Sequence, residues 1–419
     1  MAFEKVIGYE GIKKELRMLA DILKNPQKYE KLGAKPPRGA LFYGDPGLGK
    51  TLCAESFIKE TGRHAVICRK DCGEGDFVKS INQAFDVALE KAPSILFFDD
   101  LDKASNNDAY HVNSEEFATM QTRIDALKDD DVFILATINS GSNLPNSLLR
   151  TGRFDRKFEF KVPSDKDSRA IMKRYMNGKN IEKGVEEDLF KMLSGHSCSD
   201  LETVLNSAAI FAGYDGRTLI DLEDAKKAVL SVLYSWNPFD NGVADREELE
   251  FQAFHEAGHV IVDEILCPGI VNLTAIRYDA ATDGITVDNN KSIHVSNDKA
   301  AELVFTASLG GMAAIRTMFG HQITGVSSDL EHAYDSIRLL IEREAIYGFD
   351  VCNYGGGQSE LAYTKIEDYT TAELNRYYRK AEEIVRENKE SLIRVAEALI
   401  ERRSLSSSEI QALMKEKIA

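Results

Sequence analysis

One segment limits the possible folds more than any other: Gly44–Thr51, with the sequence GDPGLGKT. It fits the pattern GxxxxGK[ST]. In this pattern glycines let backbone N–H groups surround phosphate oxygens, the lysine reaches the outer phosphates and the last hydroxyl binds Mg²⁺. The apolar run Leu41–Tyr43 precedes the loop, and a helical pattern follows from Leu52. This strand, loop and helix order predicts an α/β domain with a phosphate-binding loop at the end of a strand.

Three short apolar runs extend this interpretation: Ala40–Tyr43, Ile95–Phe98 and Val132–Ala136. Each is too short for a helix and is bounded by Gly, Asp or Asn, which is typical of buried parallel strands. We therefore predict an α/β module in which a parallel sheet lies between helices.

Polar side chains follow two of these runs. The second run ends in Asp99 and Asp100, and the third is followed by Asn139. Carboxylates at the end of a buried strand are costly unless they serve a cation or a water. We predict that Asp99 belongs to a Mg²⁺ shell, that Asp100 orients an attacking water, and that Asn139 lies at the same edge.

Arg150, Arg153 and Arg156 follow at three-residue spacing. Such a pattern is compatible with a solvated face. Beside a nucleotide site, however, arginines typically act as phosphate sensors or as fingers that reach a neighbouring subunit. We favour the second interpretation because the phosphate loop is already present.

A second motif indicates metal chemistry. His255, Glu256 and His259 form the pattern HExxH. On a helix, positions i and i+4 share a face, so both imidazoles can bind one Zn²⁺ while the glutamate takes a proton from water. Ligation by two nitrogens and one oxygen favours zinc over other divalent ions. The alternative is two unrelated histidines on a core helix, but a chance match is rare in a chain with 8 His.

A catalytic zinc needs a third protein ligand, and no third histidine follows at the spacing of related motifs. From the pattern alone, Glu302, Asp329 and Glu331 are equally suitable. Asp329 lies where a turn is expected to lead into a helix, so it is also a candidate helix N-cap.

Charge and length exclude other classes of protein. The 419 residues carry 52 Lys and Arg against 68 Asp and Glu, a net charge of −16. Because nucleic acids and anionic membranes need clustered cations, we predict no nucleic-acid partner. The longest largely apolar run, Leu303–Ile315, is shorter than a membrane span, and the first twenty residues contain no signal peptide. We expect a cytoplasmic protein without a membrane segment, unless the sequence is a piece of a membrane-associated one.

The pattern of apolar residues predicts three domains. They are an α/β nucleotide-binding domain, a small helical domain and a mostly helical domain that carries HExxH: residues 1–163, 164–236 and 237–419. Within the last domain we expect a hairpin near Val271–Val287 and a long charged helix from about Thr371. A capping box of Ser406 and Glu409 should open a last short helix.

These motifs, in this order, resemble the FtsH family of AAA+ ATP-dependent zinc metalloproteases. The likeness runs nearly end to end and is carried by these segments: Phe3–Gly8, Leu23–Pro26, Lys31–Lys35, Gly44–Thr51, Leu149–Arg156, Ser199–Leu201, His255–His259, Thr324–Leu330 and Ala396–Ile400. The resemblance implies an AAA+ module with a helical lid, followed by a mostly α-helical zinc-metalloprotease domain. It also implies Zn²⁺, ATP and Mg²⁺ as cofactors, polypeptide substrates and a homohexamer.

The resemblance also implies roles for individual residues. Asp329 falls on the family's third zinc ligand, beside His255 and His259, and Glu256 on its general base. The implied first sensor is Asn139, and the implied fingers that act on a neighbouring subunit are Arg153 and Arg156. The implied nucleotide-binding residues are Ile7, Gly8, Gly44, Asp45, Pro46, Gly47, Leu48, Gly49, Lys50, Thr51, Leu52 and Asp99, with Ile7 and Gly8 near the adenine.

Several motor positions depart from the family pattern. Asp100 stands where the family usually has Glu and is one methylene shorter, which predicts slow ATP hydrolysis. Asp45 and Leu48 replace the usual Pro and Thr of the phosphate loop. Gly73 stands at the position of the pore-loop aromatic, and Ala126–Leu127 replaces an inter-subunit Gly-Phe pair.

The sequence therefore predicts an enzyme: an ATP-dependent zinc endopeptidase that unfolds or translocates polypeptides into a protease chamber and hydrolyses them with zinc-activated water. Two alternatives stay open because the protease motifs are intact while motor positions deviate. One is an ATP-gated peptidase with a weakened motor that acts on unfolded or short peptides. The other is a nucleotide-binding regulator with little turnover.

Overall fold

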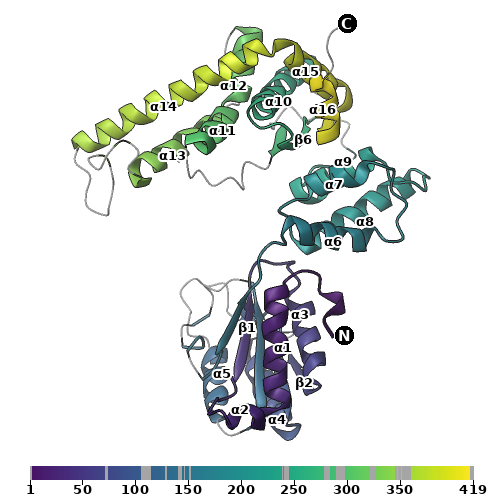
Figure 1. Ribbon diagram of the computed structural model, residues 1–419, viewed down its shortest axis with the longest axis vertical. Helices are drawn as coiled ribbons and strands as arrows, with labels where there is room; N and C mark the ends of the chain where they lie inside the picture. Colours follow the sequence, from purple (N-terminus) through teal and green to yellow (C-terminus); the bar gives the residue numbers. More distant parts are fainter. Residues whose placement is uncertain are drawn as a thin grey trace. The chain divides into compact units, whose positions relative to one another are not determined.

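The structure is a computed structural model, drawn in Figure 1. It describes residues 2–70, 74–104, 115–127, 130–139, 144–145, 147–150, 152–237, 239, 245–277, 284–288, 298–320, 327–344, 347, 351 and 360–415. Contacts divide the chain into two compact units: Met1–Lys179 with Leu193–Ser207, and Asn180–Met192 with Ala208–Ala419. The predicted lid, residues 164–236, is thus divided between the two units, and the three domain boundaries remain predictions.

The first unit contains a five-stranded sheet and its flanking helices. Its elements are η1 (Ala2–Lys5), α1 (Glu10–Lys24), α2 (Pro26–Glu30), β1 (Gly39–Tyr43), α3 (Lys50–Thr61), β2 (His64–Cys68), α4 (Glu74–Glu90), β3 (Ser94–Phe98), η2 (Leu101–Ala104), α5 (Glu115–Ala126), β4 (Val132–Ile138), β5 (Arg156–Glu159), α6 (Asp165–Met176) and the start of α8 (Cys198–Tyr214).

All strand pairs of this sheet are parallel, in the order β2-β3-β4-β1-β5. The three strands predicted from apolar runs, β1, β3 and β4, are confirmed. The two outer strands, β2 and β5, are absent from the prediction. Most of their side chains are exposed or half-buried, so neither strand is a continuous apolar run.

Helices cover both faces of the sheet (Figure 1). Successive strand residues point to opposite faces, so neighbours on β1 enter different apolar clusters. Leu41 packs in the cluster that contains Phe85 of α4, whereas Phe42 packs with Leu16 of α1 and Phe57 of α3. The predicted arrangement of a parallel sheet between helices is therefore confirmed.

The second unit is mostly helical. Its elements are α7 (Val185–Met192), the end of α8, α9 (Leu222–Tyr234), α10 (Arg246–Leu266), β6 (Val271–Ala275), β7 (Ile285–Asp288), α11 (Asp298–Ser308), α12 (Gly310–Phe319), α13 (Ser327–Glu344), α14 (Glu360–Glu387), α15 (Lys389–Arg402), β8 (Ser404–Ser406) and α16 (Ser407–Lys415). A small antiparallel sheet has the order β7-β6-β8. Strands β6 and β7 form the predicted hairpin, although its turn at 278–283 lies outside the described residues.

Helix α10 lies in the core of this unit and packs very closely against α12. A Cβ atom at Gly258 would lie 2.4 Å from the carbonyl oxygen of Gly310, and a Cβ at Gly310 would lie 2.6 Å from the carbonyl oxygen of Gly258. Only residues without side chains allow two helix backbones this close. Because α10 carries HExxH, this packing holds the motif in a fixed place.

The predicted charged helix near the C-terminus begins earlier than expected and is two helices. Helix α14 starts at Glu360 rather than near Thr371, and α15 follows after Asn388. Between residues 361 and 370 only Ile366 and Thr370 are buried, and two such positions are too few to show a helical period.

The last helix begins with the predicted capping box. The backbone N–H of Ser406 donates to Glu409 Oε2 at 2.9 Å, and the N–H of Glu409 donates to Ser406 Oγ at 3.5 Å. These reciprocal bonds satisfy donors that the first turn of α16 leaves free.

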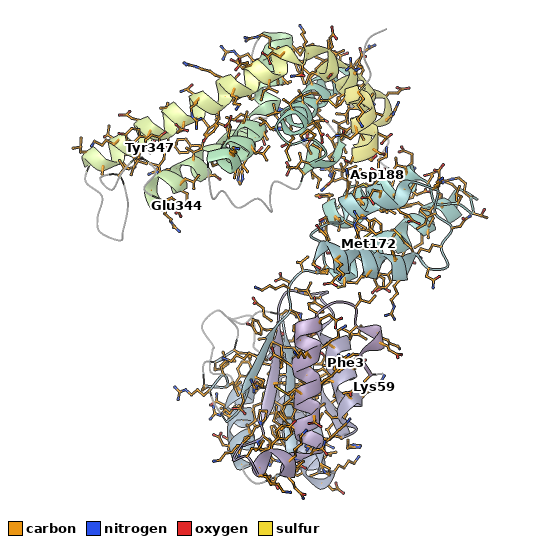
Figure 2. All side chains as sticks on the ribbon, in the orientation of Figure 1. Phe3, Lys59, Met172, Asp188, Glu344 and Tyr347 are labelled. Carbon is orange, nitrogen blue, oxygen red and sulfur yellow. The ribbon has the colours of Figure 1, made fainter. Side chains whose placement is uncertain are left out.

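Two buried charged residues join helices α7 and α9 to the C-terminal elements of the same unit. Lys226 of α9 is fully buried, and its Nζ donates to Glu409 Oε2 and to the Ser404 carbonyl, both at 2.9 Å. Asp188 of α7, labelled in Figure 2, accepts the N–H of Ser408 at 2.9 Å and its hydroxyl at 2.6 Å. Buried charges persist only when paired, so these contacts stabilise this packing.

Candidate active sites

The loop between β1 and α3 has the backbone conformation that its glycines permit. Gly44, Gly47 and Gly49 have φ angles of 139°, 76° and 83°. A Cβ at Gly44 would lie 2.1 Å from the carbonyl oxygen of Phe160, so this position requires glycine. Gly49 directly precedes α3, whose first N–H groups have no helical partners and favour an anion.

Lys50 lies over this loop. Its Nζ donates to the carbonyl oxygens of Gly44 and Asp45 at 2.8 and 2.7 Å. Burial lowers the pKa of Lys50, against the opposing effect of Asp100 and other nearby carboxylates. An ammonium in this position fits the outer phosphates of a nucleotide.

The two carboxylates after β3 lie at the same edge of the sheet. Asp99 Oδ1 accepts hydrogen bonds from Thr51 Oγ1 at 2.9 Å and from Thr137 Oγ1 at 2.8 Å. Thr137 Oγ1 also accepts the backbone N–H of Asp100 at 2.8 Å. Asp100 has a φ of 53°, which is rare for a residue with a side chain, and its Oδ2 pairs with Lys103 Nζ at 2.6 Å. Thr137, which the prediction omitted, therefore holds both acidic residues.

A cavity of about 340 Å³ opens beside the phosphate loop. Of the residues predicted to bind nucleotide, those that line it are Ile7, Gly47, Leu48, Gly49 and Leu52. Gly8 is not among its lining residues, and Asp45 and Pro46 are exposed on the loop. Sequence reasoning missed Tyr175 and Cys198, which line the cavity from α6 and α8. No local pattern connects these helices with the loop.

The predicted sensor and finger residues lie on separate elements. Arg153 Nη2 and Nε pair with the carboxylate of Asp125 at 2.7 and 3.1 Å, and its Nη1 donates to the Ser147 carbonyl at 2.6 Å. The Asp125 carboxylate raises the pKa of Arg153. Arg156 is exposed at the start of β5, and the backbone N–H of Asn139 donates to Asp102 Oδ2 at 3.1 Å. Their roles towards a neighbouring subunit remain predictions.

The motif on α10 and a residue of α13 bring three ligand atoms together. His255 Nε2 and His259 Nε2 lie 3.0 and 3.2 Å from Asp329 Oδ2, and the two nitrogens are 3.2 Å apart. Donors about 2.0–2.1 Å from a tetrahedral zinc lie about 3.3–3.4 Å from one another, close to these distances. The other candidates behave differently: Glu302 pairs with Lys380, and Glu331 is exposed.

Further contacts orient the two imidazoles. His259 Nδ1 donates to the Ala307 carbonyl at 2.8 Å, so in the neutral ring Nε2 carries the free lone pair. Burial works to lower the pKa of His259, but the hydrogen bond to Asp329 and that carboxylate's charge raise it to about 10. A proton must therefore leave His259 when a metal binds. The two nitrogens and one oxygen, their spacing and the hydrogen bond from His259 to the Ala307 carbonyl all fit a zinc site.

Gly311 on α12 leaves room for both rings. A Cβ there would lie 2.5 Å from His255 Cε1 and 2.6 Å from His259 Nε2. Gly311→Ala is expected to displace the imidazoles and to weaken zinc affinity at least about tenfold, measured by competition with a chromogenic zinc chelator. Gly213→Ala, on open helix surface, is the control and should retain wild-type affinity. Equal zinc affinity in both variants would contradict this steric argument.

Glu256 lies beside the three ligand atoms and is 4% exposed. Burial raises the pKa of its carboxyl, whereas His255 and His259 oppose the shift. Thr286 Oγ1 of β7 donates to Glu256 Oε2 at 2.7 Å. Because that hydroxyl has only one proton, Thr274 Oγ1, 2.9 Å away, must donate to Thr286. Sequence reasoning missed both threonines, which are directly opposite each other on β6 and β7 and therefore lie on the same face of the hairpin.

These groups open into a cavity of about 360 Å³. Beside the three ligand residues and Glu256, its lining includes Gly284 and Thr286 of the hairpin and Val304 and Ala307 of α11. A Cβ at Gly284 would lie 2.5 Å from Glu256 Cγ, so glycine lets the hairpin pass the glutamate. The pore-loop position Gly73 and the start of the segment Thr324–Leu330 lie outside the described residues.

Known proteins match nearly the whole length of this chain. A model of the ATPase family associated with various cellular activities (AAA) matches residues 40–162. A relative from Aster yellows witches'-broom phytoplasma, named ATP-dependent zinc metalloprotease FtsH, is 29% identical over 432 residues, which cover 98% of this chain and 64% of the relative. The chain is therefore similar, over nearly its whole length, to proteins named ATP-dependent zinc metalloprotease FtsH. Proteins of the same name from Mycoplasma mobile and Thermus thermophilus are 29% and 28% identical over 99% of this chain.

This chain spans 64% and 63% of the length of the first two relatives. The residues described above fit the cofactors expected from the sequence, Zn²⁺, ATP and Mg²⁺. Among the described helices, none is both long enough and apolar enough to cross a membrane.

Proposed function

We propose that this chain is the ATPase and protease part of an ATP-dependent zinc endopeptidase that acts on polypeptides. The observation that carries the proposal is the convergence of His255, His259 and Asp329, with ligand atoms 3.0 to 3.2 Å apart, beside the buried carboxylate of Glu256. A phosphate loop in the other unit supplies the second half of the activity.

In the proposed protease site, the two imidazoles and Asp329 hold zinc. A zinc ion held there would lower the pKa of a bound water molecule and would polarise the scissile carbonyl. Glu256 takes a proton from the attacking water and returns it to the leaving amine. Thr286 orients the Glu256 carboxylate through its 2.7 Å hydrogen bond.

In the proposed motor, Lys50 and the loop around it bind the phosphates of ATP, while Thr51 and Asp99 hold Mg²⁺. Asp100 orients the attacking water, and Asn139 serves as sensor. Arg153 and Arg156 act on the nucleotide of a neighbouring subunit in a homohexamer, which requires Arg153 to leave Asp125.

The test of this function is casein degradation by the purified chain, with and without ATP and with and without a zinc chelator. Degradation is expected only when ATP is present and the chelator is absent. Chelator-resistant degradation would contradict the zinc site, and degradation at the same rate without ATP would contradict the coupling. Absence of degradation under all four conditions would contradict the function as a whole.

Thr286→Val is expected to lower kcat for a short peptide about tenfold while KM changes little. The variant keeps the shape of the side chain but leaves the buried Glu256 oxygen without its donor, and hydrogen bonds to charged groups contribute about 1.5–3 kcal/mol. Thr286→Ser retains the hydroxyl and should keep most of the wild-type kcat. A Val variant that is as active as the Ser variant would show that the hydroxyl has no positioning role.

A further inference from the structure

Arg69 lies beside the Mg²⁺ edge of the sheet, although no sequence motif assigns it a role. It directly follows β2, which pairs in parallel with β3, and Cys68 is in register with Phe98. Arg69 and Asp99, the next residue on each strand, are therefore neighbours. Arg69 Nη2 and Nε both donate to Asp99 Oδ2, at 2.9 and 3.1 Å.

The two partners of this ion pair differ in freedom. The Asp99 side chain is 8% exposed, and its other oxygen accepts the hydroxyls of Thr51 and Thr137. The Arg69 side chain is 48% exposed. The carboxylate is thus held in place from two sides, whereas the guanidinium can move into solvent without breaking the sheet.

Mg²⁺ demands nearly octahedral oxygen ligation and is usually held by one or two carboxylates, a hydroxyl and phosphate oxygens. At this edge the hydroxyl is that of Thr51, and the carboxylate beside it is Asp99. A guanidinium on Oδ2 occupies one of the two oxygens of this carboxylate, neutralises its charge and repels a second positive charge a few ångströms away. Lys103 neutralises the adjacent carboxylate of Asp100 and not that of Asp99.

Resting on the nucleotide binding proposed above, we propose that Arg69 is an internal cation that competes with Mg²⁺ for Asp99. Binding of Mg²⁺ with nucleotide displaces the guanidinium from Oδ2. The strength of the Arg69–Asp99 pair therefore sets the Mg²⁺ concentration that the site requires. No covalent step is involved, and the exchange replaces one cation at the carboxylate with another.

The test is a Mg²⁺ titration of the binding of a fluorescent ADP analogue to the purified chain. Arg69→Gln is expected to lower the half-maximal Mg²⁺ concentration about fivefold, because a partly exposed ion pair contributes up to about a factor of five in an equilibrium. Arg69→Lys keeps the positive charge but loses the two parallel donors. Its half-maximal Mg²⁺ concentration should lie between those of the wild type and Arg69→Gln. Arg123→Gln is the control. It removes a cation of α5 that pairs with Asp86 of α4, and it should retain the wild-type half-maximal Mg²⁺ concentration.

Three results would overturn the inference. An unchanged half-maximal Mg²⁺ concentration in Arg69→Gln, with intact nucleotide binding, would show that the pair and Mg²⁺ do not compete. Weaker binding of the analogue by Arg69→Gln in excess EDTA would show that Arg69 contacts phosphate instead. Failure of the wild-type chain to bind the analogue at any Mg²⁺ concentration would overturn the proposed ATPase site and this inference together.

Discussion

Glu256→Gln is expected to lower the rate of peptide-bond hydrolysis about 10³-fold, the contribution of a well-placed general base. Glutamine has nearly the same volume and can still accept the hydrogen bond of Thr286, but it cannot take a proton from water. Zinc content and nucleotide affinity should stay at wild-type values, because the three ligand atoms belong to His255, His259 and Asp329. The measurement is the initial rate of cleavage of a quenched fluorescent peptide.

The matched control for this variant is a substitution of another acid on the same helix. Glu250→Gln changes a half-exposed carboxylate that pairs with the exposed Arg246, and it should leave the rate unchanged. Persistent hydrolysis in Glu256→Gln, with zinc still bound, would contradict the assignment of Glu256 as the base. Loss of zinc from the variant would instead indicate that Glu256 supports the ligand geometry.

Lys50→Met is expected to weaken ATP binding about a hundredfold, because charge-assisted hydrogen bonds to phosphate contribute about 1.5–3 kcal/mol each. Casein degradation should be lost with it. Hydrolysis of a short peptide should continue, since the proposed protease site belongs to the other unit. Binding is measured by titration with a fluorescent ATP analogue, and the two hydrolysis rates are measured on the same preparation.

Lys59→Met provides the control on the same helix. Lys59, labelled in Figure 2, is exposed in the last turn of α3 and should tolerate the change without loss of nucleotide affinity. Equal ATP affinity in the two variants would contradict the phosphate-binding role of Lys50. Loss of short-peptide hydrolysis in Lys50→Met alone would show that the protease site depends on nucleotide even for substrates that need no unfolding.

The sequence predicted the central part of the sheet and missed its borders. Strands β1, β3 and β4 are buried on both faces, so they appear as continuous apolar runs. Strands β2 and β5 lie at the edges, where solvent replaces one neighbour and polar residues are tolerated. The start of α14 was missed for a similar reason, because few of its early side chains are buried.

The candidate sites show the same division. His255, Glu256 and His259 lie on one helix and were recognisable from their spacing. Thr286 contacts Glu256 from a hairpin, with Thr274 behind it, and Tyr175 lines the nucleotide cavity from α6. Because these residues lie far along the chain from the motifs, no local spacing predicts their roles. Arg69 was missed because its pairing with Asp99 depends on the register of two parallel strands.

By itself, the sequence determined the zinc-binding motif and the phosphate loop, because each follows a local rule. The 3.6-residue period of a helix places residues i and i+4 on one face, and closely spaced glycines allow a loop to surround phosphate. Among Glu302, Asp329 and Glu331 the local pattern left the third ligand open, and a family resemblance was needed to prefer Asp329. The tertiary structure makes the same distinction physically. Packing of α13 brings the Asp329 oxygen within 3.2 Å of both imidazoles, whereas Glu302 pairs with Lys380 and Glu331 remains exposed. Such a choice depends on how distant elements pack against one another, which no local periodicity encodes.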